Sequence, residues 1–342
     1  MADGAVRRRE LPTHYHAAAP LRLDLAGAWT DVPPFSAREG GVVVNAAIGL
    51  QAHVELELGG EAIRLISEDL GQRVECGNAA GLEPNGRLDL LKAGLRMLPV
   101  PTPCTVTTRS DAPPGSGLGA SGALAVSLVA CLAAARQERL EARDLAEQGW
   151  YLEAVEAAIP GGKQDQLAAA LGGFNRLTFR DPDVGIEPIT LDPSFAVELE
   201  RRLVLCYTGV SRVSSDTINR VMRAYEAGES GVISALRAIK ELAERMAEAL
   251  RRADVAAVGA LLAEHWTRQQ ALDAGMRTAE MARLERAMSD AGALGGKAAG
   301  AGAGGSMFFL AGRDRGLTEA AARAAGATVL PLAWSRTGAR AW

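Results

Sequence analysis

Two carboxylates in the middle of the chain have the residue types and spacing to act on a hydroxyl group. Asp165 follows a Pro-Gly-Gly break within GGKQDQLAAALGG (161–173), so we expect it at the start of a helix or turn, pointing into a cleft. Glu153 precedes it by 12 residues, on a predicted helix. Phosphoryl transfer to an alcohol requires one carboxylate that holds a metal and one that works on the hydroxyl proton, because the protein mainly positions and neutralises the reactants.

A glycine-rich segment, APPGSGLGASGALA (112–125), offers bare backbone to a ligand. An apolar helix is predicted over residues 121–138, so the N–H groups at its start are open to an anion. Residues 117–122 match G-x-G-x-x-G, but the two prolines before them disfavour a dinucleotide site. The segment is not a Walker A loop either, because no Lys-Ser or Lys-Thr follows its last glycine. A turn without a ligand is the alternative interpretation. A second glycine-rich segment follows at 295–312.

The elements that must position these segments mix strands and helices. Strand patterns cover 21–29, 40–50, 51–58, 104–111, 201–210 and 306–310, and helix patterns cover 89–98, 145–158 and 232–252. Residues 181–194 are rich in Pro and Asp, which predicts a loop. We therefore expect two domains, residues 1–190 and residues 191–342.

Composition excludes several classes of protein. The 342 residues are 48% hydrophobic and 4% aromatic with a net charge of −4, so we expect no nucleic-acid partner. The longest apolar run, 123–135, is too short to span a bilayer, and the N-terminus lacks the apolar core of a signal peptide; we expect no membrane partner and a cytoplasmic location. The four cysteines are scattered, and His14 and His16 lack companion ligands, so a zinc site is not predicted.

Three motifs, in order, resemble those of the GHMP kinase superfamily, named for galactokinase, homoserine kinase, mevalonate kinase and phosphomevalonate kinase. They are PLRLDLAGAWTD (20–31), PPGSGLGAS (113–121) and KAAGAGAGGSMFF (297–309). The resemblance implies an α+β fold with an N-terminal half like ribosomal protein S5 domain 2 and a ferredoxin-like C-terminal half. It also implies ATP and Mg²⁺ as cofactors and a small-molecule substrate; a homodimer is left open.

The resemblance also implies roles for individual residues. Asp165 and Arg22 are the expected catalytic residues, and Ser121 and Glu153 the expected Mg²⁺ ligands. The expected phosphate loop is Pro114, Gly115, Ser116, Gly117, Leu118, Gly119, Ala120 and Ser121. The expected substrate residues are Trp29, Thr30, Asp31, Lys163, Gln164, Arg212, Gly302 and Gly304.

Several of these residues have a plainer interpretation. Asp31 could cap a turn, Glu153 could be an exposed helix charge, and Asp165 could be a helix cap. Lys163 could be a solvated turn residue and Arg212 a member of a surface ion pair. Three positions depart from the family pattern, at Ala120, at Ala28 with Trp29, and at Ala303.

The substrate class is narrowed by two further resemblances. GGKQDQLAAALGGFNRL (161–177) and YTGVSRVSSDTI (207–218) resemble bacterial kinases of D-glycero-D-manno-heptose 7-phosphate, whereas LDLAGAWTDVPPFS (23–36) also resembles the kinase domain of L-fucokinases. Both imply phosphorylation of an anomeric hydroxyl. The first predicts heptose 1,7-bisphosphate as product, the second a free sugar as substrate. A diphosphate decarboxylase and a catalytically silent sugar and ATP sensor are alternatives on the same fold.

Overall fold

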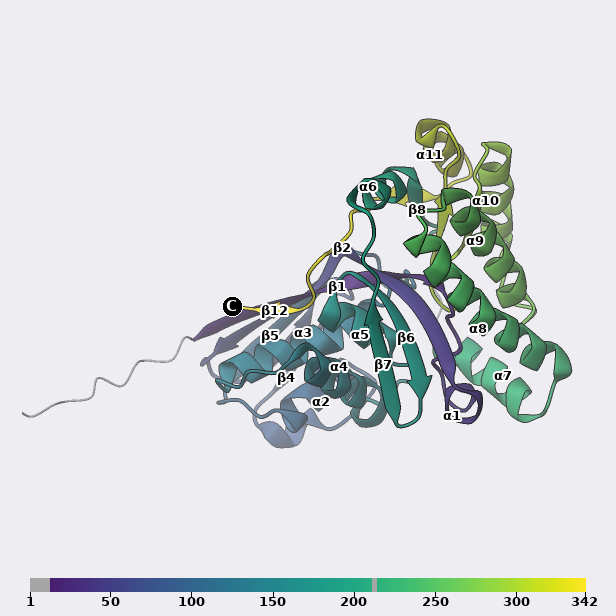
Figure 1. Ribbon diagram of the computed structural model, residues 1–342. Coiled ribbons are helices and arrows are strands. Elements are labelled where there is room, and N and C mark those ends of the chain that lie inside the picture. The colour runs from purple at the N-terminus through teal and green to yellow at the C-terminus, as the bar shows by residue number, and fades with distance from the viewer. Residues whose placement is uncertain (1–12, 211–213) are drawn as a thin grey trace, which may run out of the picture.

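The computed structural model describes residues 13–210 and 214–342 and contains two sheets with helices around each (Figure 1). The first sheet has the order β12-β1-β2-β5-β3-β4, with β6 paired to β2 and β7 paired to β6. Its strands are β1 (His14–Ala26), β2 (Gly41–Leu58), β3 (Ile63–Ser67), β4 (Gln72–Cys76), β5 (Cys104–Ser110), β6 (Phe174–Arg180), β7 (Asp183–Pro188) and β12 (Arg340–Ala341).

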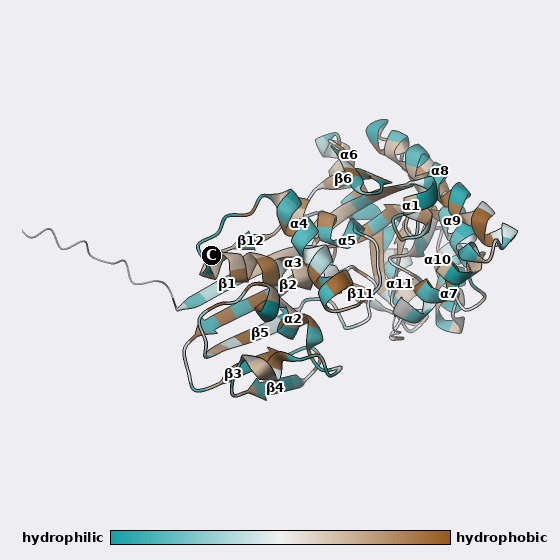
Figure 2. Ribbon diagram, turned by 90° about the horizontal axis from the view of Figure 1, so that it is seen from below, coloured by the Kyte–Doolittle hydropathy of each residue, from teal (hydrophilic) through white to brown (hydrophobic). Residues whose placement is uncertain are grey.

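Helices cover the first sheet and carry some of the predicted site residues, including Ser121 and Asp165. In Figure 1 the helices α2 (Asp89–Met97), α3 (Ala120–Ala135), α4 (Ala142–Trp150) and α5 (Gln164–Leu171) gather on one side of the strands. Helix α3 is almost wholly apolar (Figure 2) because it is buried between the sheet and its neighbouring helices. A π-helical turn, η2 (Tyr151–Glu156), continues directly from α4. The short α1 (Phe35–Glu39) and η1 (Ala79–Leu82) complete this half.

The second sheet is antiparallel, with the order β11-β8-β10-β9. Its strands are β8 (Leu203–Tyr207), β9 (Gly295–Ala298), β10 (Ser306–Leu310) and β11 (Thr328–Leu330), and its helices are α6 (Pro193–Arg202), α7 (Ser214–Glu226), α8 (Ser230–Arg251), α9 (Val255–Gln270), α10 (Ala279–Asp290) and α11 (Arg315–Ala324). One buried cluster joins Leu21 and Leu23 of β1 to Met246 of α8 and Leu310 of β10, so the two halves share a core.

Most sequence-predicted elements are found, and the α+β class is confirmed. The two strands predicted over 40–58 form one strand, β2. The prediction of a loop over 181–194 is wrong, because β7 pairs with β6 at the sheet edge and α6 begins at Pro193; most residues of β7 are exposed, which allows its polar composition. The strand predicted from residue 201 begins at Leu203, since α6 continues to Arg202.

The predicted division at residue 190 stays a prediction. The chain leaves β7 at Pro188 and enters the second sheet at Leu203, but β12 returns to the first sheet, where Ala341 pairs with Ala17. Across the described ranges, none of the helices combines the length and the apolar composition needed to span a bilayer.

Candidate active site

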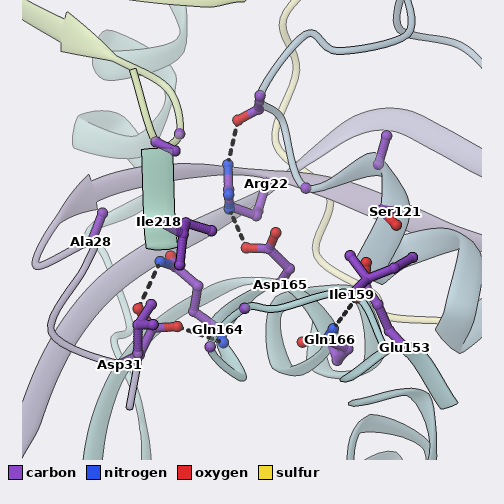
Figure 3. A pocket seen from close by; sticks show the side chains of 18 of the residues that line it. Arg22, Ala28, Asp31, Ser121, Glu153, Ile159, Gln164, Asp165, Gln166 and Ile218 are labelled. Carbon is purple, nitrogen blue, oxygen red and sulfur yellow. Dashed lines mark hydrogen bonds and ion pairs between the residues drawn. The ribbon is translucent and has the colours of Figure 1, made fainter. Parts of the chain in front are cut away.

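Most of the predicted site residues line a cavity of about 300 Å³ (Figure 3). It lies where β1, the start of α3 and the start of α5 meet the loop that follows β9. The lining residues are Arg22, Ala28, Trp29, Asp31, Val32, Gly115, Ser116, Gly117, Gly119, Ala120, Ser121, Glu153, Ile159, Pro160, Gly161, Gly162, Gln164, Asp165, Gln166, Ile218, Gly300 and Ala301.

The phosphate loop predicted from its glycines forms one wall. Gly117 and Gly119 have φ angles of 73° and 75°, a backbone region that favours glycine, and Gly119 immediately precedes α3. A Cβ on Gly300 would lie 2.5 Å from the Gly117 carbonyl oxygen, so the two glycine-rich segments pack backbone against backbone. The buried Ser116 hydroxyl has no partner among the described residues, which leaves it free for a ligand.

Two members of the predicted loop do not line the cavity. Pro114 precedes the lining residues and is exposed. Leu118 is fully buried, and its carbonyl oxygen accepts a hydrogen bond of 3.0 Å from the Arg22 backbone N–H. Leu118 therefore ties the loop to β1.

Arg22 holds Asp165 toward the phosphate loop. Its Nε donates to Asp165 Oδ1 at 2.8 Å, and its Nη1 donates to the carbonyl oxygens of Gly117 and Ala299, each at 2.8 Å. Asp165 lies in the first turn of α5, and a Cβ on Gly119 would lie 3.2 Å from its Cγ. The guanidinium thus fixes the carboxylate against the start of α3, where the backbone would face phosphates.

Asp31 is buried next to Asp165 and pairs with Gln164. Its Oδ2 accepts from the Gln164 backbone N–H at 3.2 Å, and its Oδ1 accepts from Gln164 Nε2 at 3.3 Å. Burial, followed by the negative charges of Asp165 and Asp24, raises the pKa of Asp31 from 3.8 to about 7. Gln164 Oε1 has no partner among the described residues, so this pair can receive hydroxyl groups.

Glu153 faces the cavity from the π-helical turn η2. It is 9% exposed, so the interpretation of an exposed helix charge is wrong. Its Oε2 accepts from Gln166 Nε2 at 2.5 Å, and burial raises its pKa from 4.5 to about 7, against the lowering effect of a hydrogen bond from Ser121. The described residues contain no group of three or more His, Cys, Asp or Glu side chains that could hold a metal. Glu153 and the Ser121 hydroxyl fit a Mg²⁺ ion that also binds nucleotide phosphates.

The remaining predicted substrate residues differ in position. Trp29 lines the cavity with a φ of 79°, whereas the Thr30 hydroxyl is buried against the carbonyl oxygens of Gly27 and Val42. Lys163 Nζ lies 4.4 Å from the centroid of the Trp150 ring, outside the lining.

Gly302 and Gly304 are also absent from the lining, where Gly300 and Ala301 stand instead. Arg212 lies outside the described residues.

Sequence reasoning missed several lining residues. Gln166 is the second glutamine of the QDQ triplet, and its position immediately after Asp165 was the available signal. Ile159 stands outside the quoted motifs, and Ile218 ends the quoted segment 207–218 without having been singled out; both bring apolar side chains to the cavity.

Comparisons with known proteins agree on one family. Residues 88–173 match the GHMP kinases N terminal domain, and residues 246–329 match the GHMP kinases C terminal domain. The chain is 33% identical over 299 residues to D-glycero-alpha-D-manno-heptose 7-phosphate kinase of Campylobacter jejuni, covering 85% of this chain and 87% of that protein.

Two further relatives bear on the substrate. The bifunctional fucokinase/GDP-fucose pyrophosphorylase of Arabidopsis thaliana is 28% identical over 319 residues, which are 88% of this chain and 30% of that protein. The crystal structure of a D-glycero-D-manno-heptose 1-phosphate kinase from Bacteroides thetaiotaomicron superposes with a TM-score of 0.78 at 28% identity, covering 96% of this chain and 98% of that one.

Proposed function

Because the chain belongs to the GHMP kinase family, as its three motifs predicted, we propose that it transfers the γ-phosphoryl group of Mg²⁺-ATP to the anomeric hydroxyl of D-glycero-D-manno-heptose 7-phosphate. The product would be the 1,7-bisphosphate. The observation that carries the proposal is the position of Asp165, which Arg22 holds between the phosphate loop and the Asp31–Gln164 pair.

The chain's own residues account for the main steps. Backbone N–H groups at the start of α3 and the Ser116 hydroxyl bind nucleotide phosphates. Asp31 and Gln164 accept hydrogen bonds from sugar hydroxyls, and Asp165 Oδ2 takes the proton of the attacking hydroxyl while Oδ1 stays bonded to Arg22. A Mg²⁺ ion held by Ser121 and Glu153 would neutralise charge on the transferring phosphoryl group.

The phosphate of the substrate needs a cation beyond those at the cavity wall. Arg22 is the one cationic side chain among the described lining residues, and its guanidinium already donates hydrogen bonds to Asp165 and to two carbonyl oxygens. We propose Lys163, adjacent to Gln164, and Arg212 as the partners of the 7-phosphate.

An L-fucokinase-like activity is the second candidate. Three apolar lining residues, Trp29, Val32 and Ile218, suit the methyl group of a deoxysugar, and the Arabidopsis thaliana relative has a fucokinase activity in its name. A silent sensor is disfavoured because Ser121, Glu153 and Asp165 all face the cavity.

A sugar panel with an ATP-consumption readout tests the proposal. We expect a much higher kcat/KM for heptose 7-phosphate than for L-fucose. The ³¹P NMR spectrum of the product should show the resonance of a phosphate attached to the anomeric carbon. The Lys163→Met substitution should weaken the binding of the phosphorylated sugar by a factor of about 10 and leave the binding of the free sugar unchanged. A preference for L-fucose that Lys163→Met leaves unchanged would favour the fucokinase activity, and no turnover of any sugar would contradict both.

A further inference from the structure

A buried polar network behind the cavity links the first and third motifs through helix α9. Lys297 of β9 and Asp24 of β1 form a fully buried ion pair, and Lys297 Nζ also donates to the Asp24 carbonyl oxygen at 2.8 Å. Asp24 Oδ1 in turn accepts from the Ala28 backbone N–H at 3.2 Å. The first-motif turn, defined here as residues 27–31, is therefore tied at Ala28 to the second sheet.

His265 of α9 makes a second tie to the same turn. Its ring is completely buried, and Nε2 accepts from the Gly27 backbone N–H at 3.0 Å. An accepting Nε2 requires the neutral ring with its proton on Nδ1. Burial and the positive charge of Lys297 keep the pKa of His265 well below 6.5, which supports that state. His265 Nδ1 has no hydrogen-bond partner among the described residues, so within that part of the chain the His265 ring is held by its bond from Gly27.

Gln269, one helical turn later, is bonded to a second segment of the cavity wall. Its side chain is also completely buried, and Nε2 donates to the Gly300 carbonyl oxygen at 2.9 Å. Gly300 lines the cavity and packs backbone to backbone on Gly117 of the phosphate loop. Residues four apart on a helix share one face, so α9 presents both side chains to the site together.

We propose that His265 and Gln269 are positioning residues that set the two binding regions of the cavity separately. His265 fixes the turn that presents Trp29 and Asp31 to the sugar. Gln269 fixes the segment that supports the phosphate loop, and so acts on the nucleotide. Neither side chain is among the lining residues, so each acts through the backbone that it holds. This inference rests on the proposed kinase function.

Steady-state kinetics of the full-length protein with both substrates varied tests the separation. We expect His265→Leu to raise the sugar KM about tenfold with the ATP KM changed less than about twofold, because one hydrogen bond to the first-motif turn is lost. We expect Gln269→Met, which keeps the volume and removes the donor, to raise the ATP KM by a similar factor and to leave the sugar KM within about twofold. Arg268→Ala, an exposed change on the same helix, is the control.

Rescue and stability separate positioning from folding. His265→Gln should restore the sugar KM, because its carboxamide oxygen can accept a hydrogen bond from the Gly27 backbone N–H. A general folding defect would not be corrected so selectively. Where His265→Leu does not fold, His265→Asn replaces it, since its shorter side chain stops short of Gly27. A normal sugar KM in His265→Leu or His265→Asn, or equal changes in the sugar KM and the ATP KM, would overturn the inference.

Nucleotide binding keeps the test independent of the sugar. With Mg²⁺-ATP alone in calorimetry, Gln269→Met should weaken binding and His265→Leu should not. If the wild-type protein turned over no sugar, the proposed function would fail, but this binding difference would still decide the inference.

Discussion

Replacing Gly162 by alanine places a methyl group against Asp31, in the part of the cavity that we propose for the sugar. A Cβ at this position would lie 1.8 Å from Asp31 Oδ2, 2.3 Å from its Cγ and 2.9 Å from its carbonyl oxygen, all closer than atoms can approach. Asp31 must then leave its place, and the two hydrogen bonds from Gln164 are lost. Gly161, its neighbour, has nothing within 4 Å of the same added atom, so Gly161→Ala is a matched control.

The expected size of the effect follows from those two bonds. At about 1 kcal/mol each, their loss corresponds to about 2 kcal/mol, or roughly 30-fold in kcat/KM for the sugar. The crowding itself should lower the free energy of unfolding by about 1–3 kcal/mol. The assay is kcat/KM for the sugar together with thermal unfolding of both variants, with the ATP KM expected to stay near the wild-type value. Equal kinetics for Gly162→Ala and Gly161→Ala would refute the placement of Asp31 at the sugar.

Two further perturbations test the buried carboxylates. Ser121→Ala and Glu153→Gln should raise the Mg²⁺ concentration needed for half-maximal rate, and excess Mg²⁺ should restore part of the activity; defects that Mg²⁺ leaves untouched would argue against metal ligation. The pKa of Asp31 is raised by burial from 3.8 to about 7. Between these two pH values the folded protein binds more protons than the unfolded chain, so the free energy of unfolding falls as the pH rises. The melting temperature of the wild type relative to Asp31→Asn should therefore decline from about pH 5 to about pH 8, and a constant difference would contradict the burial of that charge.

The parts of the site that the sequence predicted are those carried by local signals. Positive-φ glycines followed by an apolar helix define the phosphate loop, and the Pro-Gly-Gly break places Asp165 in the first turn of α5. Arg22, Trp29 and Asp31 came from a motif that stays contiguous in the structure.

The parts that escaped prediction depend on long-range packing. Lys297 pairs with Asp24 across 273 residues of sequence, and His265 reaches Gly27 across 238, distances over which no local pattern carries information. The π-helical form of η2, which carries Glu153, was not revealed by the periodicity of residues 145–158. Lys163 stays a proposed partner of the substrate phosphate; the contact of its Nζ with the Trp150 ring, 4.4 Å from the ring centroid, was not predicted from the sequence.

The most direct test of the account is the turnover of Asp165→Asn. The change preserves the shape of the side chain but removes the proton acceptor that Arg22 orients toward the cavity. We predict a folded protein with wild-type affinity for Mg²⁺-ATP and a rate of phosphoryl transfer in a single turnover that falls by a factor on the order of 10² to 10⁴. A near-wild-type rate would show that Asp165 only shapes the structure, and would contradict the account.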